Sequence, residues 1–90
     1  MRTFRLIVSS PGGHLFDGDA VMLSVRGMEG ELAVLAGHVP FVTTVMPCDC
    51  KIELDDDTTR IAHTEGGLLT VSAEAVTLLS GSFAWKEETE

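Results

Sequence analysis

The 90-residue chain contains no run of about 18 apolar residues, which is the length that a helix needs to cross a bilayer. It also lacks the apolar core of a signal peptide, because Met1, Arg2 and Thr3 lead directly into a strand-like segment. We therefore expect a cytosolic chain that is not itself inserted into a membrane.

Basic side chains are scarce. The chain has 6 Lys and Arg residues against 14 Asp and Glu residues, which gives a formal net charge of −8. Nucleic acids and anionic membrane surfaces bind proteins through clustered Lys and Arg, whereas the basic residues here are scattered along the chain. The composition disfavours both kinds of partner and favours other proteins.

Cysteine is also rare, and Cys48 and Cys50 are the only two in the chain. They are too few for a secreted disulfide framework, and the second ligand pair of a structural zinc site is missing. A strand would place both thiols on the face of Ile52 and Leu54, where free cysteine packs as a small hydrophobe. We expect core packing, and a small metal or redox protein that uses these thiols and a histidine is a second interpretation.

Motifs for catalysis and for metal or phosphate binding are missing as well. There is no Gly-x-Ser-x-Gly elbow, and the segment 65–67 lacks the Lys and the following helix of a phosphate-binding loop. The acidic run 55–57 lacks the Gly and the final Glu of a calcium loop, so we expect a charged hairpin tip. His14, His38 and His63 lie in three separate segments and do not indicate a metal centre. The sequence predicts no catalytic residue, no cofactor and no metal site.

The sequence does contain many short apolar runs that alternate with turn residues. Nine Gly and three Pro residues punctuate them at intervals of about 8–12 residues, the spacing of an antiparallel sandwich or barrel. Several runs alternate with period 2, most clearly at 48–54, which indicates strands with one buried face. The nine expected strands are 4–9, 14–16, 20–25, 31–35, 41–46, 48–54, 58–63, 68–72 and 75–80. An all-β chain of this size has to close on itself or stack two sheets.

An apolar island, Phe-Ala-Trp at 83–85, precedes an acidic tail at 86–90. Aromatic residues fill cores and are also enriched at protein interfaces. Two interpretations stay open: the island closes over the core, or it is an exposed anchor for a partner.

Residues 27–41 read GMEGELAVLAGHVPF. This segment resembles the signature of the epsilon subunits of F-type ATP synthases, in which a Gly- and Glu-rich loop, a strand and Gly-His-x-Pro follow one another. Further resemblance to the family lies at 4–11, 15–18, 66–71 and 76–79. The chain departs from the family after Pro47, where Cys48-Asp49-Cys50 replaces Gly and an apolar or basic residue, and at Glu90, where typical members continue into a two-helix domain.

The resemblance implies an all-β fold, a flattened ten-stranded antiparallel β-sandwich or barrel at 1–85, followed by the acidic tail at 86–90. It implies a non-catalytic subunit of the central stalk, or rotor, that clamps the gamma subunit to the c ring and couples ion-driven rotation to ATP synthesis. Such a chain is peripheral, on the cytoplasmic side of the bacterial plasma membrane. Inhibition by an inserted helix and ATP sensing are not expected, because the residues for both belong to the two-helix domain.

The resemblance also implies two docking surfaces. The loop that faces the c ring comprises Arg26, Gly27, Glu29, Gly30 and Glu31. The surface toward gamma comprises Ser9, Ser10, His38, Val39 and Pro40. The alternative function is a β-sandwich protein-interaction module of another assembly.

Overall fold

The chain folds into ten β-strands in a computed structural model that describes residues 2–55 and 57–86. The strands are β1 (Phe4–Ser10), β2 (Gly13–Ala20), β3 (Met22–Gly27), β4 (Gly30–Leu35), β5 (Phe41–Val45), β6 (Cys48–Glu53), β7 (Thr59–Thr64), β8 (Gly67–Val71), β9 (Val76–Ser80) and β10 (Phe83–Trp85). All nine strands expected from the sequence are present, and β2 is longer than expected. No helix in the described residues is long and apolar enough to span a membrane.

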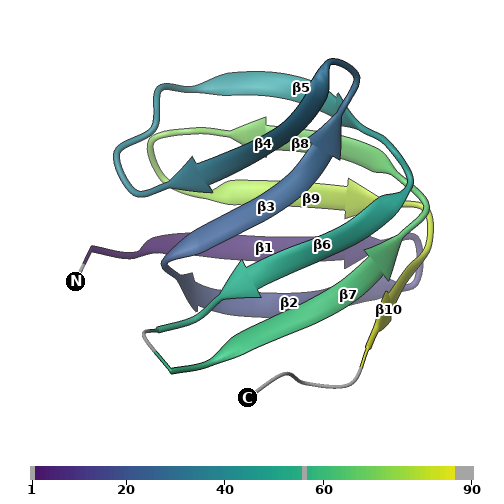
Figure 1. Cartoon of the computed structure of the whole chain (residues 1–90), viewed down its shortest axis with the longest axis horizontal. Helices are drawn as coiled ribbons and strands as arrows, with labels where there is room; N and C mark the ends of the chain where they lie inside the picture. The colour runs from purple at the N-terminus through teal and green to yellow at the C-terminus, as the bar shows by residue number, and fades with distance from the viewer. Residues whose placement is uncertain (1, 56, 87–90) are drawn as a thin grey trace.

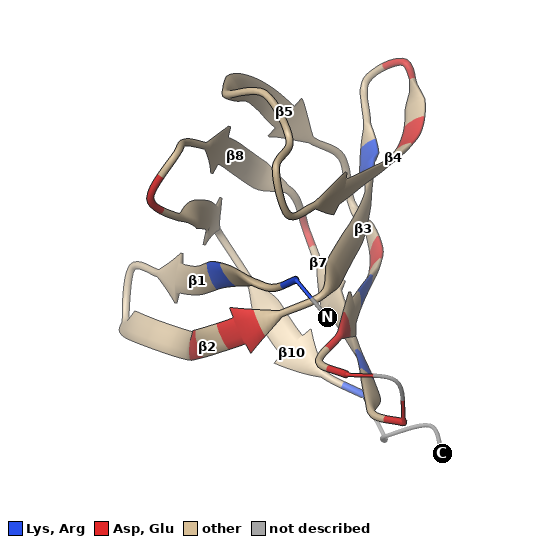
Figure 2. Cartoon of the chain, turned by 90° about the vertical axis from the view of Figure 1, so that its left-hand side faces the viewer, with Lys and Arg blue, Asp and Glu red and all other residues tan. Residues whose placement is uncertain are grey.

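The strands form one continuous sheet that curls into two layers, in the order β10-β7-β6-β3-β5-β8-β9-β1-β2, with β4 paired to β3 (Figure 1). The sheet turns from one layer to the other between β3 and β5, which pair only at Gly27 and Val45. Figure 2 shows β1 and β8 on one side and β3 and β4 on the other. The predicted flattened ten-stranded sandwich is confirmed, with β1 and β9 as a parallel pair in an otherwise antiparallel sheet.

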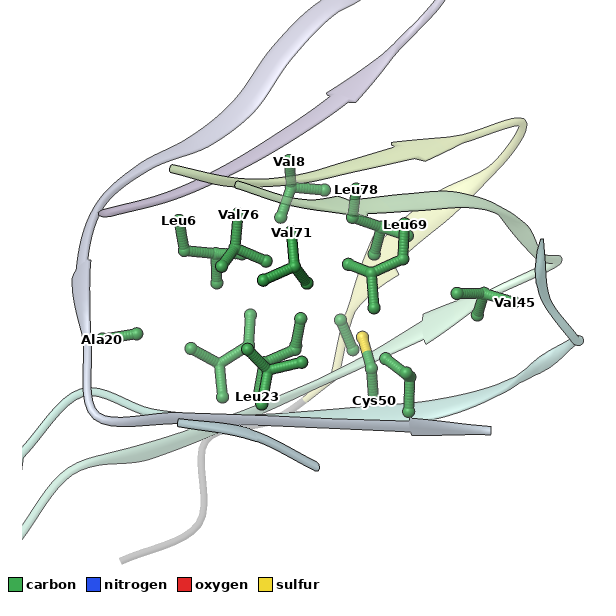
Figure 3. Close-up of a cluster of buried hydrophobic side chains, with 14 residues drawn as sticks. Leu6, Val8, Ala20, Leu23, Val45, Cys50, Leu69, Val71, Val76 and Leu78 are labelled. Carbon is green, nitrogen blue, oxygen red and sulfur yellow. The ribbon is translucent and has the colours of Figure 1, made fainter. Parts of the chain in front are cut away.

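The core lies between the two layers, where Leu6, Val8, Leu69 and Leu78 of one layer face Leu23 and its neighbours in the other (Figure 3). Each of these five side chains is fully buried. Burying a side chain of this size contributes about 1.5–3 kcal/mol relative to leaving it in water. The alternation along the strands places these side chains inside, and their burial is the main stabilisation of the fold.

The two cysteines lie on the inner face of β6, as the alternation predicts. Cys50 is completely buried in the core, and Cys48 is half-buried beside it. Burial raises the pKa of the Cys50 thiol to about 12, so the thiol stays protonated at neutral pH. Among residues 2–55 and 57–86, no group of three or more His, Cys, Asp or Glu side chains is arranged to hold a metal ion.

The apolar island at 83–85 forms the edge strand β10, which pairs with β7. The Trp85 ring lies 6.0 Å from the Phe16 ring of β2 and 5.2 Å from the Phe83 ring, in edge-to-face arrangements. The Arg60 guanidinium lies 3.7 Å from the centre of the Trp85 ring. The island therefore closes over the core where the two edge strands meet. Of the expected acidic tail, only Lys86 is among the described residues.

Candidate docking surfaces

The expected ring-facing residues form the tip of the β3–β4 hairpin. Gly27 pairs with Gly30, so Met28 and Glu29 make a two-residue turn. Gly30 has a φ of 127°, a conformation that a residue with a side chain rarely adopts. Arg26 stands directly opposite Glu31 across the two strands. The structure thus brings all five predicted residues of this loop together.

The base of the hairpin tip is held by neighbouring backbone. The Met46 amide donates a hydrogen bond of 2.8 Å to the Arg26 carbonyl. A side chain at Gly27 would come within 3.0 Å of the Leu32 side chain, so the strands are closely packed at this point. Met28 and Glu29 themselves are exposed. The tip is an acidic projection on a fixed base.

Met28 was not among the predicted site residues, yet 74% of its surface is exposed. Met46, which lies beside the base of the tip, is 39% exposed. An apolar side chain at the turn of a charged hairpin was the sequence signal that could have identified Met28. The tip therefore presents an apolar side chain next to its carboxylates.

The residues expected to face gamma do not form one cluster. Ser9 and Ser10 end β1, whereas the loop 38–40 precedes β5. In the register of β5, β8, β9 and β1, the start of β5 is level with Leu6. Ser9 is level with Leu79, which lies farther along β9. The two groups therefore lie toward opposite ends of one sheet layer.

An uncharged surface joins these two groups. The outward side chains of β5, β8, β9 and the second half of β1 carry no charge, and we call this surface the uncharged face. Its members are Ile7, Ser9, Val42, Thr44, Leu68, Thr70, Thr77 and Leu79. Val42 is 61% exposed and Leu79 is 51% exposed. The bidentate pair of Arg5 with Asp17 borders this face on β1 and β2.

The outward face of the other layer is different in character. It carries the charged side chains Arg26, Glu31, Asp49, Lys51 and Glu53, together with His63. Figure 2 shows the same contrast, since β5 and β8 carry no acidic or basic residue. Contiguous exposed apolar surface on a small soluble domain marks an interaction site, and depletion of charge is typical of the core of an interface. The uncharged face is thus the strongest candidate docking surface in the described residues.

Comparison with known proteins gives a matching family and several relatives. Residues 3–86 match the family described as ATP synthase, Delta/Epsilon chain, beta-sandwich domain. The chain is 36% identical over 86 residues to the sodium ion specific ATP synthase epsilon chain of Acetobacterium woodii, covering 96% of this chain and 65% of the relative. It is 35% identical over 80 residues to the ATP synthase epsilon chain of Acinetobacter baylyi, covering 89% of this chain and 58% of that one.

Solved structures share the fold. A chain in the mitochondrial ATP synthase of Euglena gracilis superposes with a TM-score of 0.86 at 20% identity, over 92% of this chain and 53% of that chain. A chain in the central stalk and c ring of the Tetrahymena thermophila mitochondrial ATP synthase superposes with a TM-score of 0.78 at 12% identity. The match covers 91% of this chain and 66% of that chain. The present chain thus spans roughly three fifths of the length of its curated relatives.

Proposed function

Because this chain belongs to the ATP synthase Delta/Epsilon chain family and forms its β-sandwich domain, we propose that it is an epsilon subunit in the central stalk of an F-type ATP synthase. In this role it catalyses no reaction. It clamps the gamma subunit to the c ring and thereby transmits ion-driven rotation to the ATP-synthesising head. The observation that carries the proposal is the uncharged face, which is exposed in the isolated chain and has the composition of a protein-binding surface.

The gamma subunit docks on the uncharged face. A standard interface covers about 800 Å² on each partner, which is roughly a sixth of the 5289 Å² surface of this chain. Val42, Leu68 and Leu79 provide apolar side chains for its centre, and the threonines of the face offer hydroxyl groups. Ser9 and Ser10 at one end and the loop 38–40 at the other form the rim.

The β3–β4 hairpin tip contacts the polar loops of the c ring. Glu29 and Glu31 pair there with basic side chains, while Met28 packs between neighbouring loops. Exposed ion pairs contribute only about 0–1 kcal/mol each, so these contacts determine register more than affinity. The tip and the loop 38–40 lie toward opposite ends of β4, so both partners have room to bind together (Figure 1).

A rotor clamp has to transmit torque without deforming, and the fold meets this need. Two edge strands, β2 and β10, are joined by the contact between Phe16 and Trp85, so both layers are fastened at the side opposite the turn between β3 and β5. In this assembly the chain is located on the cytoplasmic side of the bacterial plasma membrane, and it is attached through its partners.

The proposal is tested by assembling purified gamma and c ring with and without this chain. We expect stable association of gamma with the ring only when the chain is added, with all three components in one complex. A folded chain that binds neither gamma nor the ring would contradict the proposal and favour the alternative, an interaction module of another assembly.

A further inference from the structure

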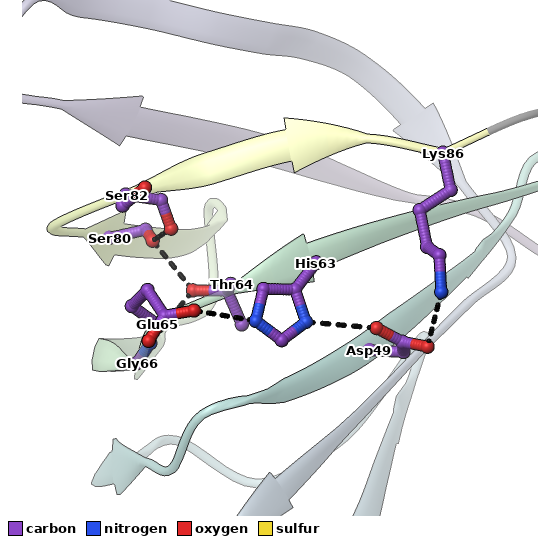
Figure 4. Close-up of polar contacts among 8 residues, drawn as sticks. All are labelled: Asp49, His63, Thr64, Glu65, Gly66, Ser80, Ser82 and Lys86. Atoms are coloured by element: carbon purple, nitrogen blue, oxygen red, sulfur yellow. Dashed lines mark hydrogen bonds and ion pairs between the residues drawn. The ribbon is translucent and has the colours of Figure 1, made fainter.

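His63 is held between two carboxylates on the charged layer (Figure 4). Its Nδ1 atom lies 3.0 Å from Asp49 Oδ1, and its Nε2 atom lies 2.6 Å from Glu65 Oε2. The other oxygen of Asp49 accepts a hydrogen bond of 2.9 Å from the Lys86 ammonium. These four side chains form one connected cluster, in which the His63 side chain is 45% exposed.

The geometry requires a particular protonation state. A neutral imidazole has one N–H and one lone pair, whereas a carboxylate only accepts hydrogen bonds. Both contacts of His63 are therefore hydrogen bonds only when both ring nitrogens carry a proton. Loss of that proton turns a lone pair toward Asp49 or Glu65, and one of the two contacts becomes repulsive.

The cluster connects elements that are distant in the sequence. Asp49 is on β6, His63 is on β7, Glu65 begins the connection to β8, and Lys86 follows β10. Two backbone hydrogen bonds lie next to this cluster. The Glu65 amide donates to the Ser82 carbonyl at 3.0 Å. The Lys86 amide donates to the Ile61 carbonyl at 2.8 Å. The short edge strand β10 is thus fixed at both ends next to this cluster.

We propose that Asp49, His63, Glu65 and Lys86 form a proton-controlled clasp that fixes the two ends of β10 to β6 and β7 when His63 is protonated and loosens them when it is not. We call it the His63 clasp. Asp49 on β6 is directly opposite His63, and Glu65 in the β7–β8 connection contacts the other ring nitrogen. Lys86 after β10 contacts Asp49, and Lys51 lies two residues after Asp49 on the same face of β6, opposite Ile61. On β10 the residue opposite His63 is the uncharged Ala84.

The electrostatics agree in sign with this geometry. Hydrogen bonds to Asp49 and to Glu65 raise the pKa of His63 above its ordinary value of 6.5, against a smaller opposing effect of burial. Because the folded-state pKa is raised, the stabilisation is fully present below pH 6.5 and is lost as the pH rises through the folded-state pKa. The clasp therefore responds as the pH rises through a folded-state pKa that lies above 6.5, and its four side chains lie outside the uncharged face.

An NMR titration of His63 tests the first part of the inference. We expect the midpoint in the folded wild-type chain to exceed that in the urea-unfolded chain, and to fall in the double variant Asp49→Asn/Glu65→Gln. Glu53→Gln, which removes a carboxylate from the same face outside the cluster, should leave the midpoint unchanged. A His63 midpoint that is equal in folded and unfolded wild-type chains would overturn the clasp.

Hydrogen exchange of the Glu65 and Lys86 amides tests the second part. The protection factors of these two amides, corrected for intrinsic exchange, should fall about two- to fivefold as the pH rises through the His63 midpoint. A change of this size is what the loss of an exposed ion pair produces. In the His63→Gln variant it should not change over the same range. Wild-type protection that does not depend on pH would show that His63 does not hold β10.

Discussion

Leu68 of β8 and Leu79 of β9 lie directly opposite each other, and both side chains point into solvent. Cross-strand neighbours on one sheet face have Cβ atoms only about 4.5–5.5 Å apart, so the pair forms one continuous apolar surface. Thr44 lies beside Leu68 on one side and Ser9 beside Leu79 on the other. This row of four uncharged side chains crosses one layer near the end at which β1, β5 and β9 finish. A solvated sheet face would ordinarily carry charges there.

The hairpin tip gives a prediction about the ring contact. Glu31→Lys should weaken binding of the chain to the c ring by up to about fivefold, because it replaces an attraction to basic loops by a repulsion of similar small size. Glu53→Lys is the matched control, since it makes the same charge change on the same layer away from the tip. Binding is measured by titrating isolated rings, and equal affinities for the two variants would contradict the assignment of the tip.

Gly67 is predicted to be essential for the fold. A Cβ atom at this position would lie 1.8 Å from the Leu79 carbonyl oxygen, and backbone at that distance has to move. Gly67→Ala should therefore lower the free energy of unfolding by about 3 kcal/mol or more. Gly12→Ala is the control, because its nearest atom would be 3.8 Å away. Urea denaturation measures both, and equal stabilities would show that β8 and β9 are packed less closely than described.

Trp85 is predicted to stabilise the junction of the edge strands. Trp85→Ala removes the contacts with Phe16 and Phe83 and the stacking with Arg60, and it should cost about 2–3 kcal/mol of unfolding free energy. Trp85→Phe retains the apolar contact and should cost less than half of that. Thermal denaturation compares the two variants. A Trp85→Ala chain as stable as the wild type would mean that β10 is not part of the cooperative unit.

The β6–β7 hairpin should lose stability in acid through Asp55. One oxygen of this carboxylate accepts hydrogen bonds from the Asp57 and Thr58 amides, and these bonds lower its pKa below 3.8. A lowered folded-state pKa means that its stabilisation is present above pH 3.8 and is lost as the pH falls through the folded-state pKa. Asp55→Asn keeps an oxygen acceptor but should abolish this acid dependence. Amide exchange of Asp57 and Thr58 measures it, and identical pH profiles for both chains would refute the role.

The strands were predictable because their apolar positions alternate along the sequence. The run at 48–54 placed Cys50 and Ile52 in the core without any knowledge of the fold. Alternation alone located nine strands and not the tenth, which only the resemblance implied, because a segment as short as 83–85 shows too little alternation to distinguish a strand from a terminal anchor. Its burial depends on Phe16, which is far away in the sequence.

The hairpin tip was also predictable, because its residues are neighbours in the chain. The uncharged face was not, because it depends on the register among β1, β5, β8 and β9, which alternation within each strand does not determine. The resemblance assigned Ser9 and His38 to the surface toward gamma, and the register adds that they lie toward opposite ends of that layer. The one sequence signal for the uncharged face was the presence of apolar residues at outward strand positions, as at Val42, Leu68 and Leu79.

Calorimetric titration of the cognate gamma subunit into the chain tests the central claim most directly, with Leu68→Asp compared to Ala33→Asp. Both variants place a carboxylate at an exposed strand position, but Leu68 is on the uncharged face and Ala33 is on the other layer. We predict a one-to-one complex for the wild type, unchanged affinity for Ala33→Asp, and affinity at least about tenfold lower for folded Leu68→Asp. Equal affinity of both variants for gamma would contradict the claim that gamma docks on the uncharged face.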